Sequence, residues 1–417
     1  MDNYKKMIDK LKNYNQEQLL KIIENFEEND KQGISQQIDQ LDFMAIDELY
    51  KSLSKKEKEN GEGIEPIVSI NKNKLTSEQL EEYQELGEEV LKKNEYALVT
   101  MSGGQGTRLG FDGPKGTYQI DIEPRPKYLF EILAENLIKA NNKYNVTIPW
   151  YIMTSSENND KIIEFFEKNR YFNYPKENVM FFKQGNLPLI TTQGKLIISG
   201  KKRIKEAADG NGGIFNSMSE SGIIADLEKR NIKWVFIGSI DNILLNIADP
   251  ILVGLAIKSN VEIATKSIIK NSPDEKVGVI CKQDKKIRVI EYSEMSDELK
   301  NMKNEDGELK FGESHIMCNL FSIKALKKLA NKKMPYHIAF KKSDYINDEN
   351  VIVKPEKPNV YKFEKFIFDA WTYFDDIAIL RGEREADFAP VKNASGVDSP
   401  ETAIKLYNKF NAKQHNK

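Results

Sequence analysis

The sequence contains few of the residues that build disulfide frameworks or metal clusters. Only two of its 417 residues are cysteines, Cys281 and Cys318, and only three are histidines. So few cysteines argue against a disulfide framework and against a structural zinc site. The histidines also lack any paired metal-ligand spacing. We therefore expect both cysteines to be small buried residues and not nucleophiles.

The sequence also lacks a large excess of charge and any long apolar run. The formal net charge is −2, from 62 basic and 64 acidic residues, so there is no electrostatic reason to expect nucleic-acid or membrane binding. No apolar run approaches the ~20 residues that span a bilayer, and the first residues lack the apolar core of a signal peptide. We expect a soluble, cytoplasmic protein, either a monomer or a weak homo-oligomer.

The chain changes character near residue 96. Residues 1–60 are polar, with apolar residues near helical spacing, which predicts an amphipathic helical segment that packs on another part of the chain. Residues 61–75 contain Gly61, Gly63 and Pro66 and are predicted to be a linker, and residues 77–93 a helix. Further helices are predicted at Leu129–Ala140 and Lys161–Lys168. Strands are predicted at Tyr96–Met101, Trp150–Thr154, Val179–Phe182, Trp234–Ile237, Val261–Ser267 and Val277–Lys282.

This alternation of strands and helices predicts an α/β fold, a Rossmann-like, doubly wound sheet that is mixed but mostly parallel. We predict a helical N-terminal segment (1–90), a catalytic domain (91–395) and a short C-terminal helix with a polar tail (396–417). Ligands of such sheets bind beyond the carboxyl ends of the strands. The loops after Met101, Thr154, Phe182 and Ile237 are therefore expected around one crevice.

A glycine-rich loop, S-G-G-Q-G-T-R-L-G at 102–110, directly follows the first predicted strand. Three glycines in four positions let backbone amides approach a phosphate closely. The dinucleotide fingerprint would need glycine where Leu109 stands, which disfavours an NAD-type binding module. The Walker A motif fails too, because Lys115 lies between Pro114 and Gly116. Arg108 and Lys115 supply cations for phosphate oxygens, as nucleotidyl transfer requires.

A carboxylate at a second strand end completes this pattern. Asp241 follows the predicted strand Trp234–Ile237, and Mg²⁺ prefers hard oxygen ligands such as carboxylates. We therefore expect Asp241 to bind Mg²⁺, with Mn²⁺ as a possible substitute.

Taken together, the motifs resemble those of the eukaryotic-type UDP-sugar pyrophosphorylases, and most of all the members that act on N-acetylglucosamine 1-phosphate. The resemblance covers about residues 90–405, and its motifs follow one another in the order of the family. Longer members continue into a separate β-rich C-terminal domain, whereas here a helix and a tail are predicted after the last motif. The motifs lie at residues 102–110 with 114–116, 150–155, 182–188, 209–213, 241–244, 278–281 with 289–294, 334–339, 365–369 and 388–394.

The resemblance implies a nucleotide site made largely of backbone groups. The amides of Gly103 and Gly104 would contact uridine and phosphates, and Gln184 would hydrogen-bond uracil, since a planar amide both donates and accepts. Gly210 and Asn211 would lie near the uracil and ribose. On its own, the sequence around Asn211 would be interpreted only as a turn.

The resemblance also implies a sugar site and its phosphate contact. The backbone of Gly278 and the carboxylate of Glu291 would hold sugar hydroxyls, and Asn319 would lie near the 2-substituent. Phe366 and Phe368 would wall an N-acetyl pocket. Without the resemblance, we would interpret Glu291 as solvated surface. The two phenylalanines, which alternate on a predicted strand, would be assigned to the core.

The implied activity is uridylyl transfer, with UTP and N-acetylglucosamine 1-phosphate giving UDP-N-acetylglucosamine and pyrophosphate. Lys392 would bind the sugar phosphate, while Arg108 and Lys115 would stabilise the leaving pyrophosphate. Glucose 1-phosphate and N-acetylgalactosamine 1-phosphate remain alternative substrates. A catalytically inactive UDP-sugar sensor remains an alternative of another class, although a mere binder would not need the leaving-group cations.

Overall fold

The computed structural model describes residues 2–53, 63–292 and 294–415. The chain divides into two compact units, each built from separate stretches. Unit 1 contains residues 1–60, 185–212 and 334–366, and unit 2 contains residues 61–184, 213–333 and 367–417. The units cross the domain ranges predicted from the sequence, which remain a prediction.

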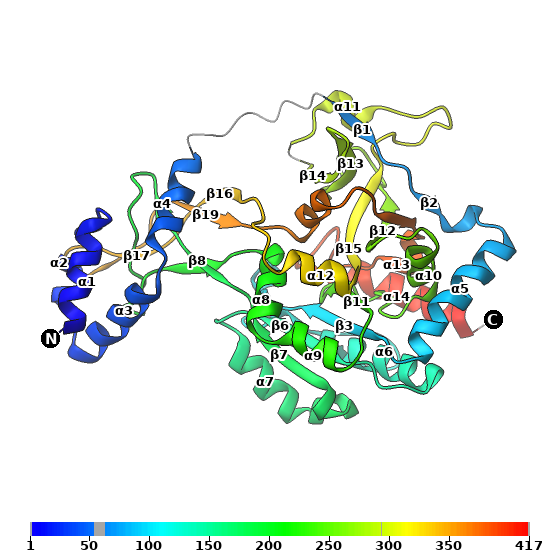
Figure 1. Cartoon of the computed structure of the whole chain (residues 1–417), viewed down its shortest axis with the longest axis horizontal. Helices are drawn as coiled ribbons and strands as arrows, with labels where there is room; N and C mark the ends of the chain where they lie inside the picture. The colour runs from blue at the N-terminus through cyan, green and yellow to red at the C-terminus, as the bar shows by residue number, and fades with distance from the viewer. Residues whose placement is uncertain (1, 54–62, 293, 416–417) are drawn as a thin grey trace. The chain divides into compact units, whose positions relative to one another are not determined.

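The N-terminal residues of unit 1 form helices, as the sequence predicts: α1 (Asp2–Asn13), α2 (Gln18–Glu24), α3 (Glu28–Gln40) and α4 (Phe43–Ser52). Their apolar faces, with Leu11 and Ile34 fully buried, form one core with Ile190, Ile198 and Phe363. The amphipathic pattern therefore marks a face that packs on later segments of the same unit (Figure 1). Those segments carry β8 (Asn186–Pro188), β9 (Ile190–Thr191), β10 (Glu206–Ala208), β16 (His337–Lys341), β17 (Tyr345–Ile346), β18 (Ile352–Val353) and β19 (Val360–Glu364).

Unit 2 is built on a large mixed sheet. Its main path runs in the order β2 (Ile70–Asn71), β20 (Ala378–Arg381), β12 (Ile263–Ile269), β15 (Glu313–Ser322), β11 (Trp234–Ser239), β3 (Tyr96–Met101), β6 (Trp150–Thr154) and β7 (Val179–Lys183). Strand β15 is antiparallel to both of its neighbours, and the other neighbouring pairs are parallel. The predicted mostly parallel α/β sheet is thus confirmed. Because β3 is buried at all six positions, its sequence is a continuous apolar run, as expected for a strand covered on both faces.

Three more strands join this sheet through β15, namely β1 (Ile64–Pro66), β13 (Val279–Gln283) and β14 (Lys286–Ile290). Other elements of unit 2 lie around the sheet (Figure 1). They comprise β4 (Gln119–Ile120), β5 (Lys127–Tyr128), α5 (Ser77–Lys92), α6 (Leu129–Tyr144), α7 (Asn159–Lys168), α8 (Ile214–Glu220), α9 (Ile223–Lys229), α10 (Pro250–Lys258), α11 (Asp297–Asn301), α12 (Ile323–Leu329), α13 (Arg384–Asp387) and α14 (Pro400–His415). Helix α5 packs directly on α10. A Cβ atom on Gly87 would lie 1.9 Å from the Pro250 carbonyl oxygen, so glycine at this crossing allows the close approach.

The prediction of a linker at residues 61–75 is wrong for residues 64–75. Strand β1 pairs antiparallel with β13, and β2 pairs parallel with β20 in the main sheet. The glycines and the proline suggested a linker, but Pro66 lies in β1, whose one pairing partner among the described residues is β13, and proline is tolerated in such edge positions. Residues 61 and 62 lie outside the described residues.

Candidate active site

The glycine-rich loop begins at the carboxyl end of β3 and is anchored to the end of β6. Ser102 is buried, and both its backbone N–H and its hydroxyl donate to the carbonyl of Met153 at 2.9 Å. The buried Asn158 side chain donates to the carbonyl of Ser102 at 3.1 Å and accepts from the N–H of Ser155 at 2.8 Å. The strand ends therefore fix where the loop starts.

The loop then folds back so that Lys115 lies beside Gly104. The N–H of Lys115 donates to the Gly104 carbonyl at 3.1 Å, and the N–H of Gly106 donates to the Gly113 carbonyl at 2.9 Å. Gly110 adopts a left-handed conformation with φ of 70°. A Cβ atom on Gly104 would meet nothing within 4 Å. The loop thus presents Gly104 to open space, which suits backbone contact with a phosphate.

Gly103 and Gln184, both predicted to contact the nucleotide, lie side by side. Gln184 follows β7, where its N–H donates to the Thr154 carbonyl at 2.8 Å, and its side chain is buried. A Cβ atom on Gly103 would lie 2.6 Å from Gln184 Nε2. Glycine at 103 is therefore what lets the Gln184 amide lie against the loop.

The predicted metal ligand and a predicted catalytic lysine form an ion pair. Lys115 Nζ lies 3.3 Å from Asp241 Oδ2, and both side chains are mostly buried. Burial by itself would raise the pKa of the Asp241 carboxyl. The charges of Lys115 and Lys392, with hydrogen bonds from Ser239 and Lys115, outweigh burial and lower the pKa to about 2. Asp241 is therefore an anion among cations near neutral pH.

Backbone hydrogen bonds bring the remaining predicted catalytic residues to the same place. The N–H of Val391, next to Lys392, donates to the Asp241 carbonyl at 2.9 Å, and the N–H of Ala394 donates to the Arg108 carbonyl at 3.0 Å. The Arg108 side chain is exposed. The structure thus gathers Arg108, Lys115, Asp241 and Lys392 at the carboxyl ends of β3 and β11.

Sequence reasoning missed the residue that holds these segments together. Asn242 is buried. Its side-chain N–H₂ group donates to the Asp387 carbonyl at 2.7 Å, and its side-chain oxygen accepts from the Ala389 N–H at 2.9 Å. Asn242 lies within the motif at 241–244, but nothing in the sequence indicates its contacts with residues 387 and 389.

Two predicted sugar-binding residues flank the open end of the hairpin formed by β13 and β14. Val279 pairs with Ile290, so Gly278 and Glu291 are the next positions outward. A Cβ atom on Gly278 would lie 3.5 Å from a carboxylate oxygen of Glu291. The Glu291 carboxylate therefore lies beside the Gly278 backbone, where both could contact one ligand.

Asn319 and Phe368 also lie in this region of unit 2, but the local structure differs from the prediction. Asn319 is fully buried on β15. The predicted strand through Phe366 and Phe368 is wrong, because β19 ends at Glu364 and residues Ile367–Tyr373 form a 3₁₀ helix. Phe368 is buried and its ring meets His315 edge-on, with centroids 5.7 Å apart.

Gly210, Asn211 and Phe366 belong to unit 1 or its border and are described there. Gly210 has φ of 88°, and a Cβ atom on it would lie 2.3 Å from the Lys365 carbonyl oxygen. Asn211 begins a short 3₁₀ helix, and the Phe366 ring packs on His337 at 4.5 Å. The predicted roles of all three remain predictions.

Unit 1 contains a buried ion pair that the sequence did not predict. Lys365 Nζ lies 3.1 Å from Asp209 Oδ2, and both side chains are largely buried. Burial would lower the pKa of Lys365, but the charge of Asp209 and contacts with Asp209 and Tyr336 raise it. The backbones of the two residues are also hydrogen-bonded, because the N–H of Lys365 donates to the Asp209 carbonyl at 2.7 Å.

The available side chains fit a metal ion that takes some of its ligands from the protein and the others from a substrate. Among the described residues, no group of three His, Cys, Asp or Glu side chains could hold a metal. Mg²⁺ is commonly bound by one or two carboxylates together with substrate phosphates. The ionised Asp241 carboxylate, partly exposed at a strand end, meets that requirement.

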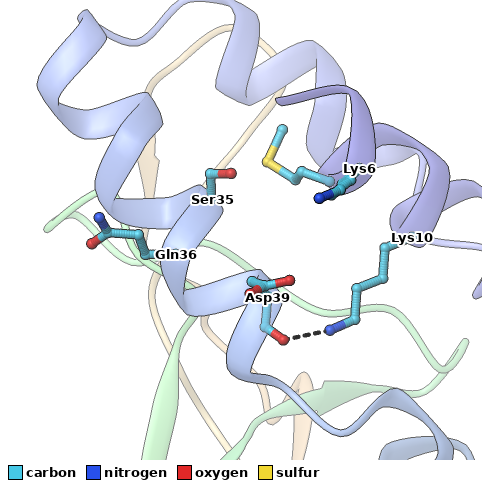
Figure 2. Close-up of a pocket in the computed structure, with 6 residues that line it drawn as sticks. Lys6, Lys10, Ser35, Gln36 and Asp39 are labelled. Carbon is cyan, nitrogen blue, oxygen red and sulfur yellow. Dashed lines mark hydrogen bonds between the residues drawn. The ribbon is translucent and has the colours of Figure 1, made fainter. Parts of the chain in front are cut away.

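Other features lie apart from these residues. A small pocket in unit 1 lies between α1 and α3, where Lys10 Nζ donates to the Asp39 carbonyl at 2.7 Å (Figure 2). None of the predicted site residues lines it. Cys281 and Cys318 are both buried, as expected, and burial raises the pKa of the Cys281 thiol to about 12. In the described part of the chain, no helix has the length and apolar character to cross a membrane.

The chain has a mixed, mostly parallel α/β fold, with a cluster of cationic side chains and one carboxylate at the strand ends. The sequence matches the family described as UTP–glucose-1-phosphate uridylyltransferase over residues 43–408, and the chain belongs to that family.

Individual relatives narrow the comparison. A UDP-N-acetylglucosamine pyrophosphorylase of Saccharomyces cerevisiae is 38% identical, over 86% of this chain and 78% of its own length. UDP-N-acetylglucosamine diphosphorylase 2 of Arabidopsis thaliana is 33% identical, over 95% of this chain and 82% of its own. The crystal structure of the Trypanosoma brucei UDP-N-acetylglucosamine pyrophosphorylase with an inhibitor matches with a TM-score of 0.80 at 28% identity. That match covers 97% of this chain and 84% of the other.

Proposed function

We propose that this chain is a uridylyltransferase that makes UDP-N-acetylglucosamine and pyrophosphate from UTP and N-acetylglucosamine 1-phosphate. The observation that carries the proposal is the cluster at the carboxyl ends of β3 and β11, where Lys115 lies 3.3 Å from Asp241 and Lys392 adds a second positive charge. Two similar proteins named for this sugar nucleotide, one of them 38% identical, support the choice of sugar.

The reaction is a direct displacement. A phosphate oxygen of the sugar 1-phosphate attacks the α-phosphorus of UTP, and the bond from that phosphorus to the bridging oxygen breaks, so pyrophosphate leaves with the electron pair. No proton must be removed, since the attacking phosphate is already an anion at neutral pH. The protein therefore contributes positioning and charge stabilisation, which dominate catalysis of this kind of transfer.

Each group in the cluster has a task in this scheme. Lys392 binds the sugar phosphate, and its positive charge reduces the repulsion between that phosphate and the phosphates of UTP. Arg108 and Lys115 stabilise the charge that develops on pyrophosphate. Gly104 faces open space in which a phosphate can approach the backbone, and the Gln184 amide beside Gly103 pairs with uracil.

Asp241 is the residue that would hold Mg²⁺, or Mn²⁺ in its place. When bound, the metal would neutralise phosphate charge. Asp241 itself is kept ionised by the neighbouring lysines, so it would be ready to bind a cation across the working pH range.

The sugar itself is the open choice. Glucose 1-phosphate is the second candidate, because the family description names it. N-acetylgalactosamine 1-phosphate is a third, and an inactive sensor of UDP-sugars is the alternative without chemistry. We further propose a cytoplasmic location. We also propose that the protein is a monomer or a weak homo-oligomer, and light scattering would test this oligomeric state.

One assay separates these candidates. Pyrophosphate release from UTP is measured with each of the three sugar phosphates, with Mg²⁺ present. The proposal predicts the highest kcat/KM with N-acetylglucosamine 1-phosphate. A higher value with glucose 1-phosphate would reassign the substrate. Release with none of the three, together with binding of UDP-N-acetylglucosamine by calorimetry, would favour the sensor.

A further inference from the structure

His315 lies at the centre of the predicted sugar-binding residues of unit 2, although it belongs to none of the motifs that predict the site. It is buried on β15. Its backbone N–H donates to the Gly278 carbonyl at 3.0 Å, and its Nε2 lies 2.9 Å from Asn319 Oδ1. Its ring meets Phe368 edge-on at 5.7 Å and Trp371 edge-on at 5.1 Å. One residue thus contacts three parts of the candidate sugar site.

A bulge in β15 makes the contact with Asn319 possible. In a regular strand, residues four apart are about 13 Å apart, because each residue rises ~3.3 Å. Here Asn319 pairs with Thr265 and His315 pairs with Ser267, so three residues of β15 stand opposite one of β12. Met317, within the bulge, has a φ of 56°. The bulge therefore places His315 and Asn319 on one face as close neighbours.

The chemistry of His315 fixes the orientation of the Asn319 amide. Burial lowers the pKa of His315 to about 4, so the ring is neutral near pH 7. Asn319 Oδ1 can only accept, so His315 Nε2 carries the proton and donates to it. Thr265 Oγ1 lies 3.2 Å from the same oxygen, but its hydroxyl also lies 3.0 Å from the Cys318 carbonyl, so His315 is the main donor to Asn319 Oδ1. With Oδ1 turned toward the imidazole, the amide nitrogen points away from it.

That nitrogen has no partner within the described structure. Asn319 Nδ2 is a buried donor without a hydrogen bond among the described residues, and burying a donor without a partner is unfavourable. A ligand oxygen is a suitable partner, because His315 joins Asn319 to Gly278 and Phe368, two other predicted sugar-binding residues. Since Asn319 is fully buried, the oxygen must reach Nδ2 through a local movement of the side chains that cover it.

We propose that His315 is a positioning residue for the sugar, and that it holds Asn319 with its N–H₂ group turned toward an oxygen acceptor of the bound sugar 1-phosphate. The inference rests on the proposed function and deepens it. Without the imidazole N–H, the amide can rotate and present its oxygen instead, so the donor is lost to the ligand. Among the described residues, no hydrogen bond, ion pair or ring contact joins His315 to Arg108, Lys115, Asp241 or Lys392, so UTP binding should not depend on it.

The test compares two variants of the full-length chain by steady-state kinetics. His315→Phe keeps a ring of similar size but removes the donor, and His315→Gln keeps an N–H at nearly the same place. For His315→Phe we expect the KM for N-acetylglucosamine 1-phosphate to rise about tenfold, the loss of one hydrogen bond, with the KM for UTP unchanged. His315→Gln should restore most of the affinity for the sugar.

The outcomes are distinguishable. An unchanged sugar KM in His315→Phe, or an equal rise of both KM values, would overturn the positioning role while leaving the proposed function intact. If His315→Phe does not fold, His315→Gln decides: a sugar KM close to that of the wild type supports the role, and a large rise contradicts it. A wild-type chain without turnover on any sugar phosphate would refute the proposed function, and this inference with it.

Discussion

Replacing Lys266 by methionine should destabilise unit 2 severely. Lys266, on β12, is almost fully buried, and its Nζ lies 2.5 Å from Asp249 Oδ2 and 2.6 Å from Asp387 Oδ1. Burial would lower the pKa of Lys266, but the two carboxylates raise it well above its usual value, and Lys266 helps to lower that of Asp249. The buried cluster has one positive and two negative charges, and Lys266 is the cation that both carboxylates contact.

The magnitude follows from what the substitution leaves behind. Methionine fills most of the volume but leaves two buried carboxylates without a counter-charge. Removing one partner of a buried ion pair costs about 3–5 kcal/mol. Urea unfolding followed by tryptophan fluorescence would measure it, because Trp150, Trp234 and Trp371 all lie in unit 2. Lys258→Met is the matched control, since Lys258 forms an exposed ion pair with Glu82 and should leave the midpoint nearly unchanged.

The pH dependence gives a second readout of the same cluster. The depressed pKa of Asp249 stabilises the wild type above the unfolded pKa of about 3.9, and this contribution is lost only as the pH falls through the folded value. The raised pKa of Lys266 stabilises it below about 10.4. The cluster contribution should therefore be flat between pH 5 and 9.

In Lys266→Met the sign reverses. Without the Lys266 charge, burial should raise the carboxyl pKa of Asp249, so the folded variant takes up a proton and gains stability as the pH falls. The difference in unfolding free energy between the variant and the wild type should shrink from pH 8 to pH 5. Adding Asp387→Asn to the variant should restore part of the lost stability. A loss below 1 kcal/mol, or a difference that does not change with pH, would refute the reasoning.

Three further predictions concern the candidate active site. Gly103→Ala should raise the KM for UTP at least tenfold, because the new Cβ would lie 2.6 Å from Gln184 Nε2. Gly104→Ala should fold as the wild type, because its Cβ would meet nothing within 4 Å. A Gly103→Ala variant with the unfolding midpoint and the KM of the wild type would contradict this. Lys392→Ala should lower kcat at least a hundredfold with an unchanged circular dichroism spectrum, and near wild-type turnover would exclude its assigned role. Chelation by EDTA should abolish activity, Mg²⁺ should restore it, and Asp241→Asn should weaken the Mg²⁺ dependence; full activity in EDTA would rule out the metal.

From the sequence alone, the residues predicted to contact the phosphates could be named and expected to lie close together. The reason is local: a run that is apolar except for Thr100 predicts β3, and a glycine-rich loop directly after a buried strand is typical of a phosphate site. Arg108, Lys115 and Asp241 lie next to such strand ends, so parallel topology alone brings them together. The structure confirms that proximity, while the roles of these residues remain to be tested.

The sugar side depends on features that no local pattern reveals. The pattern F-I-F at 366–368 alternates like a strand, yet Ile367, Phe368, Ala370 and Trp371 are buried at helical spacing. The contact of His315 with Asn319 requires a bulge at Met317, and a bulge has no reliable signature in one sequence. The Lys266 cluster joins Lys266 to Asp387, more than a hundred positions away, and only the tertiary fold brings them together.

The most direct test of the account is transfer of label from [α-³²P]UTP. The wild-type chain, Mg²⁺ and N-acetylglucosamine 1-phosphate would be incubated together and the products separated by chromatography. The account predicts label in UDP-N-acetylglucosamine, equal in amount to the pyrophosphate released, and none on the protein, with Lys392→Ala strongly impaired. Absence of labelled UDP-sugar with the wild-type chain would contradict the central claim that these strand ends form a uridylyltransferase site.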